Sequence, residues 1–466
     1  MTKGAVRRIA DATLVARAHA ILAGGARPLV IFGVALAARS AWVAYAPSDP
    51  FDGRLSLGDA VFYHSSAASL AQGHGYVMPS TPLGMRGWNT AFWPPGYPFV
   101  LASLYRLVGP HVSMAWGANI VLGTLTCVIL YFVGRTAFSE RAGFAAGLLL
   151  AVFPGHVFFS SLILSEVTFT FFITLAMLLI LAVNRADDKG RPLRVVLLGL
   201  VVGFAALTRG QGLFLIPVAL VFWLSQTGDW ARALPWATAT MLTAAVVILP
   251  WTVRNYVQMG SLVIISTNDG VNLYMGHNEL ATGRMMYNPG SLADRVYADL
   301  PPSRREVATS NLLLREGLKY MFTHPGRELQ LSWAKIRALY ADDEEGIRQI
   351  PNRQAGKTVR AEGLIGRAAN VYFFVTLALS AGGVFIWLRR RRGGLSLPLL
   401  VIAVFTIGHL PFFGDPRFHY PMLPSFALLA AAALVSTAEW ARAGCYRRRP
   451  SAESAPGERR VHRHRR

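Results

Sequence analysis

The sequence predicts an all-α integral membrane protein with about ten membrane-spanning helices, and two observations lead to that class. Of the 466 residues, 53% are hydrophobic and only 15% are charged, whereas a soluble protein carries roughly 25% charged residues. The charge is missing from apolar runs that approach or reach the roughly 17–25 residues a bilayer core requires. The arginine clusters, in turn, border these runs, as expected for cytoplasmic loops.

Nine apolar runs are spread over the whole chain. Some are long enough to span a bilayer alone, and the shorter ones reach that length with their flanks. A soluble core helix is the alternative for any one run, but nine such runs in one chain favour a membrane bundle. The runs are residues 30–45, 115–133, 162–183, 195–206, 213–224, 236–251, 371–388, 395–410 and 421–435.

Arginine positions predict the threading of the helices. The N-terminal residues include Lys3, Arg7, Arg8 and Arg17 and show no small-residue cleavage site, so the first helix is expected to be an uncleaved cytoplasmic-side anchor. Ten spans, the nine runs and a third helix at about residues 142–158, then put every strong cluster inside. These clusters are residues 135–141, 185–194, 389–392 and the tail after residue 447.

Two long stretches lie outside in this threading. The first outer loop, 46–116, contains a short apolar segment, 95–108, that is expected to lie as a helix at the membrane surface. The seventh helix is expected to end at Pro250–Trp251 and to lead into the outer segment 252–367. Within that segment, 310–340 has a helical pattern interrupted at His324–Pro325.

The chain therefore divides into four parts. Residues 1–251 form a membrane module whose first outer loop carries the active site, and 252–367 form the outer segment. Residues 368–440 are the C-terminal spans, and 441–466 are a basic, disordered cytoplasmic tail on the anionic inner leaflet. The net charge of +21 thus indicates membrane lipids rather than nucleic acid, and Cys127 and Cys445 imply no disulfide or cysteine metal site.

Two carboxylates stand out on the outer side. Asp59 begins a helical stretch, so helix capping is the simplest interpretation of it alone. Glu166 lies where an outer loop enters the fourth helix: an acid there suits the helix dipole, but a carboxylate at membrane depth is costly and often functional. Both interpretations of Glu166 stay open, while His64 and His74 are interpreted as ordinary loop polarity.

Several arginines lie at the same level. Arg209 is at the tip of a tight hairpin, Arg254 follows Pro250–Trp251, and Arg417 precedes the last helix. Each can snorkel to the interface, yet outer positive charge is disfavoured, so the group points to an anionic ligand such as phosphate. Trp88, Trp93 and Tyr97 suit interfacial anchoring.

This set of residues fits a sugar linked by phosphate to a membrane lipid. A carboxylate takes the proton of an acceptor hydroxyl, arginines stabilise the charge that develops on the leaving phosphate, and aromatic rings stack on sugars.

The order of local motifs resembles the membrane glycosyltransferases of the GT-C fold, glycosyltransferase family 39, near protein mannosyltransferases and aminoarabinose transferases. The motifs span most of the chain. They are Gly58-Asp59 with Tyr63, Gly73-His74-Gly75-Tyr76, Pro94-Pro95-Gly96-Tyr97-Pro98, Ser165-Glu166, Leu207-Thr208-Arg209, Pro250 to Tyr256, Asp269 to Leu273, Gly276-His277-Asn278 and Arg417-Phe418-His419-Tyr420-Pro421.

The resemblance implies a polyprenyl-phosphate sugar donor, an inverting displacement and a site facing the periplasm of the bacterial inner membrane. Asp59 would be the base, and Glu166 would position the acceptor or a cation. Substrate-binding residues would be Tyr63, Tyr97, Arg209, Arg254, Arg417 and Tyr420. Relatives often have a second acid where this chain has Ala60, so a divalent cation stays an open possibility. The acceptor may be a lipid, a glycan or a protein.

Two other functions remain as alternatives. A polysaccharide ligase or polymerase would use a diphosphate-linked donor and depend on 252–367 more than on Asp59. A lipid or glycan transporter would place polar groups near the bilayer midplane; the sequence predicts helix interiors almost free of charge.

Overall fold

The computed structural model describes residues 25–51, 58–78, 87–285, 299–349, 358–389 and 396–447. Helices dominate these ranges, and their only β-structure is two isolated bridges, Val77 with Asn89 and Arg284 with Gly414. The predicted all-α class is confirmed. The arginines at 390–392 and the tail beyond residue 447 lie outside the described residues.

Eight described helices are long and apolar enough to cross a membrane. They are Gly25–Tyr45, α4 (Val112–Ala137), α7 (Glu166–Arg185), α8 (Arg191–Thr208), the run of η2 (Gly210–Phe214) with α9 (Leu215–Thr227), α10 (Trp230–Met259), Gly363–Arg389 within α16 (Thr358–Arg389), and the run Pro416–Arg442 formed by η3 (Pro416–Met422) and α18 (Leu423–Arg447).

Two further apolar segments complete the ten that the sequence predicts. The third segment is broken: α5 (Glu140–Ala151) is followed by α6 (Pro154–Phe158) and η1 (Phe159–Ser161), with a bend of 59° between the two halves. Pro154 lies at the break, where it removes a backbone donor. The ninth segment, α17 (Leu397–Gly408), is a short apolar helix.

The prediction that the seventh helix ends at Pro250–Trp251 is wrong. α10 continues to Met259 with Pro235 and Pro250 inside it. Membrane helices tolerate internal proline because neighbouring side chains satisfy the freed backbone groups. The helix ends at Gly260, whose φ of 66° is the left-handed conformation that favours glycine. Arg254 is therefore a helical residue rather than a loop residue.

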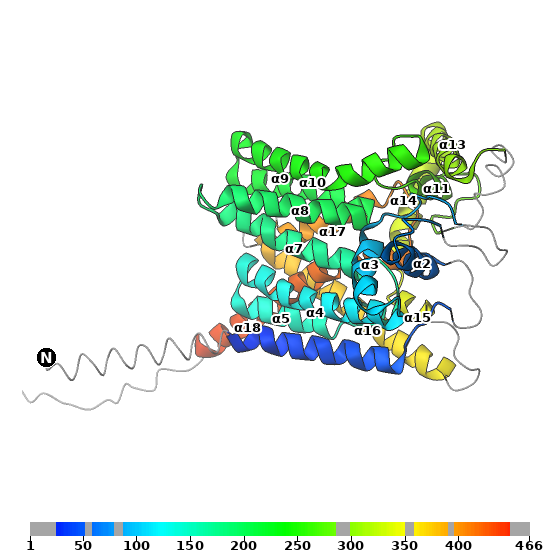
Figure 1. Ribbon diagram of the computed structural model, residues 1–466. Coiled ribbons are helices and arrows are strands. Elements are labelled where there is room, and N and C mark those ends of the chain that lie inside the picture. Colours follow the sequence, from blue (N-terminus) through cyan, green and yellow to red (C-terminus); the bar gives the residue numbers. More distant parts are fainter. Residues whose placement is uncertain are drawn as a thin grey trace, which may run out of the picture.

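The spans lie side by side, and the shorter helices gather at one end of the bundle (Figure 1). These are α2 (Asp59–Ala71), α3 (Gly96–Val108), α11 (Asn268–Gly276), α13 (Pro302–Thr323), α14 (Pro325–Leu339) and α15 (Glu345–Arg348). The helix predicted for 95–108 is confirmed as α3, and the predicted break at His324–Pro325 separates α13 from α14.

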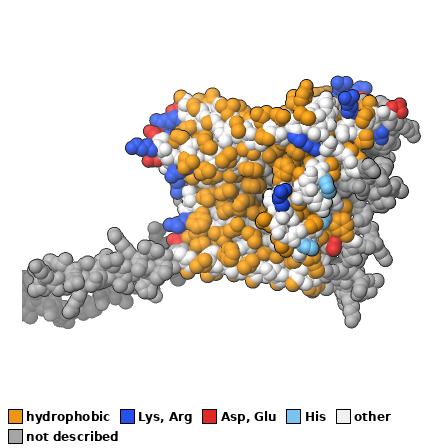
Figure 2. Space-filling model, in the orientation of Figure 1, with side chains coloured by type: hydrophobic (Ala, Val, Ile, Leu, Met, Phe, Trp, Pro, Cys, Tyr) orange, Lys and Arg blue, Asp and Glu red, His pale blue; other side chains and the backbone are white. Residues whose placement is uncertain are grey.

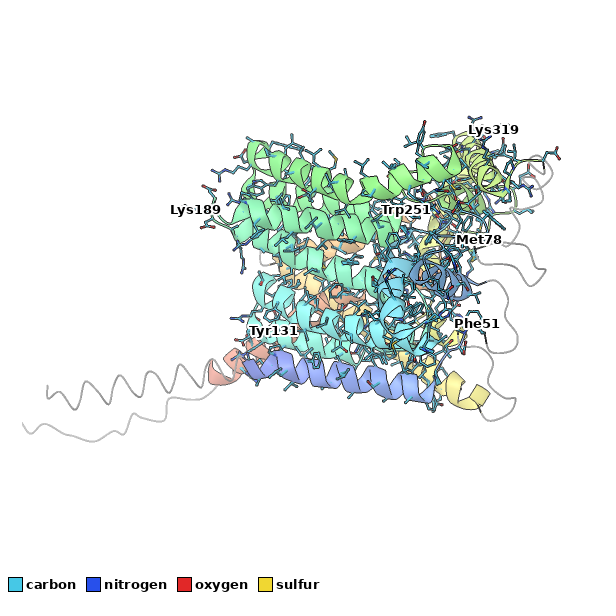
Figure 3. The ribbon with its side chains drawn as sticks, viewed as in Figure 1. Phe51, Met78, Tyr131, Lys189, Trp251 and Lys319 are labelled. Atoms are coloured by element: carbon cyan, nitrogen blue, oxygen red, sulfur yellow. The ribbon has the colours of Figure 1, made fainter. Side chains whose placement is uncertain are left out.

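The two ends of the bundle carry different parts of the chain. Met78, Trp251 and Lys319 lie at the end with the short helices, and Lys189, in the predicted cytoplasmic loop, lies at the opposite end (Figure 3). On the face shown in Figure 2, hydrophobic side chains cover the bundle between those ends. The first loop and the outer segment therefore share one end, as the threading predicts.

Candidate active site

Four charged residues from distant parts of the sequence meet at the end with the short helices. Asp59 is the first residue of α2, Glu166 the first of α7, Arg209 directly follows α8, and Arg417 lies in η3. Nη2 of Arg417 donates to Oδ2 of Asp59 over 2.7 Å, and Nη1 of Arg209 lies 2.8 Å from Oε1 of Glu166. Arg417 also pairs through Nε with Glu166. Two arginines thus compensate two carboxylates.

Burial distinguishes the two carboxylates. The side chain of Glu166 is 1% exposed, whereas that of Asp59 is 27% exposed. Oε1 of Glu166 accepts a hydrogen bond from Arg209 and forms an ion pair with Arg417, and its buried Oε2 has no hydrogen-bond partner among the described residues. Glu166 is therefore the buried partner of both arginines, and Asp59 is the more accessible of the two carboxylates.

The helix-capping interpretation of Asp59 is wrong. Gly58 occupies the N-cap of α2, and no side chain makes a capping hydrogen bond there. An N-cap side chain must precede the helix to reach its free amides, whereas Asp59 is one residue inside. Its carboxylate instead binds Arg417, 358 residues away.

Two of the predicted aromatic residues form a wall beside these charges. Tyr63, one turn along α2, donates a 3.4 Å hydrogen bond to Oγ of Ser165, which also accepts from Arg209. Burial, with the nearby Asp59 carboxylate, raises the pKa of Tyr63, so the phenol stays protonated. Its ring meets that of Tyr97 edge-on, with centroids 5.3 Å apart. Both side chains are almost fully buried.

Arg254 has a different set of contacts from the four charged residues. Its guanidinium donates to the carbonyls of Thr90 at 2.7 Å and Tyr76 at 2.6 Å and lies over the Trp251 ring at 4.8 Å. Glu306 holds the same loop, accepting from Thr90 Oγ1 and Ala91 N. Arg254 therefore fastens the first outer loop to α10, and the geometry gives no direct support to its predicted role in substrate binding.

Tyr420 makes its hydrogen bond and ring contacts with the broken third segment. Its hydroxyl donates to the carbonyl of His156 over 3.3 Å, and its ring stacks on that histidine with centroids 5.2 Å apart. Tyr420 thus packs against the broken third segment. It shares η3 with Arg417, so its contribution to the site is through the placement of η3.

His64 and His74 differ in their surroundings. The interpretation of His64 as loop polarity is wrong: it lies in α2, is buried, and is hydrogen-bonded to the Tyr105 hydroxyl at 2.8 Å. Burial lowers its pKa. His74 is exposed, in agreement with the loop interpretation.

The prediction of nearly charge-free helix interiors fails at Arg39. This residue of the first helix is fully buried, and its guanidinium contacts the carbonyls of Ala35 and Ala151, Sγ of Cys127 and Nδ1 of His156. Ala151 ends α5, so Arg39 binds the backbone at the helix break. The position of Arg39 inside the apolar run 30–45 was the feature of the sequence that could have predicted this buried charge.

A second buried pair borders the same break. Asp343, between α14 and α15, accepts from Gly155 N over 2.9 Å and lies 3.2 Å from Nε2 of His419 in η3. Burial raises the pKa of Asp343, against the effect of His419. No local pattern signals these contacts, because Asp343, Gly155 and His419 are far apart in the chain.

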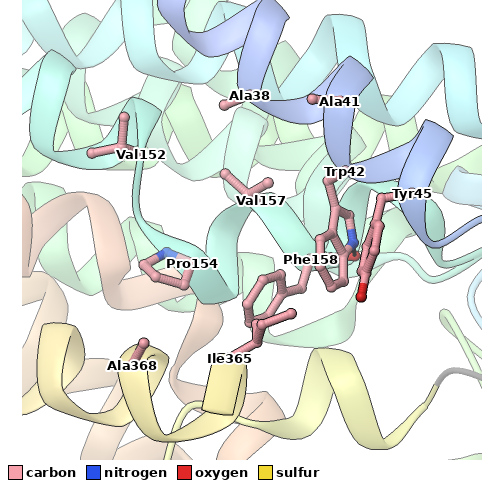
Figure 4. A pocket seen from close by; sticks show the side chains of 10 residues that line it. All are labelled: Ala38, Ala41, Trp42, Tyr45, Val152, Pro154, Val157, Phe158, Ile365 and Ala368. Carbon is pink, nitrogen blue, oxygen red and sulfur yellow. Dashed lines mark hydrogen bonds between the residues drawn. The ribbon is translucent and has the colours of Figure 1, made fainter. Parts of the chain in front are cut away.

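A cavity of about 650 Å³ opens on the other side of the broken segment (Figure 4). Its walls are Trp42, Tyr45, Phe158 and smaller apolar residues of the first helix, α6 and α16. It contains no charged side chain, so it suits an apolar chain and offers no catalytic group.

The donor set does not fit a divalent cation. No group of three or more His, Cys, Asp or Glu side chains in the described ranges could hold a metal. At the candidate site, arginines already occupy both carboxylates, and Ala60 supplies no further ligand.

Comparisons with known proteins agree with this picture. Residues 93–253, about a third of the chain, match the family model for dolichyl-phosphate-mannose-protein mannosyltransferase. Over 204 residues the chain is 30% identical to the undecaprenyl phosphate-alpha-4-amino-4-deoxy-L-arabinose arabinosyl transferase of Pseudomonas aeruginosa (strain UCBPP-PA14), covering 42% of this chain and 36% of that one. The chain thus spans about a third of the length of the curated relatives it matches.

The fold is shared with a solved membrane enzyme. The archaeal oligosaccharyltransferase AglB from Archaeoglobus fulgidus, in complex with an inhibitory peptide and a dolichol-phosphate, superimposes with a TM-score of 0.54 at 18% identity, over 92% of this chain and 52% of that chain. ArnT from Cupriavidus metallidurans, bound to undecaprenyl phosphate, gives 0.41 at 17% identity over 92% and 81%. The predicted GT-C membrane fold and the motif resemblance are confirmed.

Proposed function

We propose that this protein transfers a sugar from a polyprenyl-phosphate donor to an acceptor hydroxyl at the outer face of the cytoplasmic membrane. The observation that carries the proposal is Arg417, which bridges the reachable carboxylate of Asp59 and the buried carboxylate of Glu166. The relatives at 30% identity, named for an undecaprenyl-phosphate-linked sugar, support the same donor class.

Asp59 is the general base in this proposal. Its ion pair with Arg417 uses Oδ2, which leaves Oδ1 to take the proton from the acceptor hydroxyl. The acceptor oxygen then attacks the anomeric carbon from the side opposite the phosphate. The bond between the anomeric carbon and the phosphate oxygen breaks, and the polyprenyl phosphate leaves. The transferred sugar has the inverted anomeric configuration.

Arg417 and Arg209 stabilise the leaving phosphate. A guanidinium has five N–H donors; the contacts of Arg417 use Nη2 and Nε, and those of Arg209 use Nη1. One terminal nitrogen of each arginine therefore remains for phosphate. Glu166 fixes both arginines before the reaction, and such preorganised charge stabilises a transition state without reorganisation.

The experiment that tests this function compares glycan masses in a host lacking the gene. Lipid, polysaccharide and protein fractions are analysed by mass spectrometry after complementation with wild type, Asp59→Asn or Asp49→Asn. General-base catalysis contributes about 10²–10⁴-fold, so Asp59→Asn should lose at least about 100-fold of the transfer. Asp49, an exposed aspartate of the same outer loop, is the matched control and should behave as wild type.

A glycan mass that is lost with the gene and restored only by wild type and Asp49→Asn supports the proposal, and its fraction identifies the acceptor. Restoration by Asp59→Asn would remove Asp59 as the base. No glycan change in any fraction would contradict the transferase itself and favour a transporter. Loss of a long polymer rather than one sugar would favour the ligase alternative.

A further inference from the structure

Three ionisable side chains of the outer segment form a trio, two of them buried, that has no part in the proposed transfer. Glu328 and Lys335 lie two turns apart on α14, and His277 directly follows α11. Nδ1 of His277 is 2.7 Å from Oε2 of Glu328, and Nζ of Lys335 is 3.0 Å from Nε2 of His277. His277 and Lys335 are each 2% exposed. His277 belongs to the Gly276-His277-Asn278 motif, to which the proposed transfer assigns no role.

The trio contacts the backbone of the segment that leads to Arg417. Nζ of Lys335 donates to the carbonyl of Leu410 over 2.8 Å, and Nε2 of His277 lies 2.9 Å from the carbonyl of Pro411. Gly276 packs so closely on the next carbonyl, that of Phe412, that an added Cβ would lie 2.1 Å from it. The outer segment thus contacts three consecutive carbonyls of this segment.

Contacts with the outer segment continue up to Arg417 and beyond it. Gly414 N donates to Gly283 O over 2.8 Å, and His419 Nδ1 lies 2.8 Å from the carbonyl of Leu339, the last residue of α14. We call residues 410–419 the arginine strip. The outer segment contacts this strip on both sides of Arg417, and therefore fixes where the guanidinium meets Asp59 and Glu166.

We propose that His277, Lys335 and Glu328 are positioning residues, which act on transfer through the arginine strip by holding Arg417 against the two carboxylates. The inference rests on the proposed function and extends it to the outer segment. None of the three touches the reacting groups. They act through Arg417, whose proposed role is to stabilise the charge that develops on the leaving phosphate, so we expect their main effect on kcat.

The protonation of Lys335 makes the contact between the trio and the arginine strip dependent on pH. Burial lowers the pKa of Lys335 to about 8, against the opposing effect of Glu328. Burial and the adjacent Lys335 lower the pKa of His277, again against Glu328. Residues 410–414 contribute carbonyls and no charged side chain, and the charges that act most on Lys335 and His277 are those of the trio itself. A neutral amine donates more weakly than an ammonium.

The test measures kcat and KM from pH 6 to 9.5 for purified full-length protein in detergent, using undecaprenyl-phosphate sugar and the acceptor fraction identified above. Wild-type kcat should fall as pH rises through about 8, because Lys335 then loses its proton. Lys335→Met should lower kcat about 10- to 100-fold, the order expected for a small misplacement remote from the chemistry, leave KM within about twofold, and abolish that alkaline fall.

A second variant keeps the lysine in place. Glu328 raises the pKa of Lys335, so the nearly isosteric Glu328→Gln should move the alkaline fall to lower pH. Lys319→Met is the matched control, since Lys319 is an exposed lysine of α13 in the same outer segment. It should match wild type in rate and pH profile.

The outcomes separate the two proposals. Absence of transfer by wild type at every pH contradicts the proposed function. An active wild type whose alkaline fall is unchanged in both Lys335→Met and Glu328→Gln overturns the positioning role. A reduced rate with an unchanged pH profile would assign the trio to stability alone, and it would overturn the role as well.

Discussion

Two arginines of this protein are largely buried near the broken segment and the reaction centre, but their partners differ. Arg417 lies between two carboxylates. Arg39 contacts carbonyls, a thiol and an imidazole, and no carboxylate pairs with it within the described ranges. A charge at membrane depth is expensive. The two carboxylates compensate Arg417, and the free carbonyl at the helix break accounts for Arg39.

The role of Arg39 can be tested by its removal. Arg39→Met should lower the free energy of unfolding by about 2–6 kcal/mol, because the carbonyl of Ala151 and the ring of His156 both lose a buried donor, at about 1–3 kcal/mol each. Thermal or chemical unfolding in detergent measures the change. The control is Arg27→Met in the same helix, where Arg27 is paired with Glu140 at the surface; surface pairs contribute at most about 1 kcal/mol. Equal effects of the two variants would contradict this account.

At the scale of elements, α4 packs on α5 through glycines. A Cβ built on Gly134 would lie 2.6 Å from Cα of Gly143 and 2.8 Å from Cδ1 of Leu428. Membrane helices approach closely where small residues line the contact. Gly117, in the same helix, has no atom within 4 Å of such a Cβ, so only one of these two glycines is required by packing.

This difference predicts unequal effects of the same substitution. Gly134→Ala should destabilise the bundle by about 1–3 kcal/mol, the usual cost of overpacking, because backbone lies on one side of the new methyl group. Gly117→Ala should have no such cost and should gain slightly from the better helix propensity of alanine. Melting temperatures of the two variants in one detergent decide the matter; a lower value for Gly117→Ala than for Gly134→Ala would contradict the packing.

The elements also explain why the site needs distant parts of the sequence. α2, α7, η2 with its preceding residue, and η3 each contribute one charged side chain. α14 and the turn after α11 hold η3 in turn. The outer segment therefore packs directly against the region around Arg417 and is not a separate domain.

At the scale of the whole molecule, the two ends of the bundle predict opposite accessibility. Lys189 lies at one end, and Lys319 lies with the short helices at the other (Figure 3). If the site faces outward, a membrane-impermeant maleimide should label Lys319→Cys in spheroplasts and Lys189→Cys only after permeabilisation. Cys445→Ser is the background; Cys127 is buried. The reverse pattern would place the site in the cytoplasm and contradict the predicted orientation.

The sequence by itself determined the class of the molecule and the position of its helices. Hydrophobicity and arginine placement are local properties, and they located all ten apolar segments, the surface helix α3 and the break between α13 and α14. The end of α10 was misplaced because proline stops helices in water but is tolerated where neighbours satisfy the backbone. The motifs also identified Asp59, Glu166, Arg209 and Arg417, which the fold brings together.

Only the tertiary structure decided what these residues do to one another. The pairing of Asp59 with Arg417 joins positions 358 residues apart, and no local pattern encodes such a contact. The same holds for Arg254, which fastens a loop, for Tyr420, which faces the broken segment, and for Lys335, which is buried against the strip that carries Arg417. Charge and hydropathy are written along the chain, whereas burial and pairing arise only when distant segments pack.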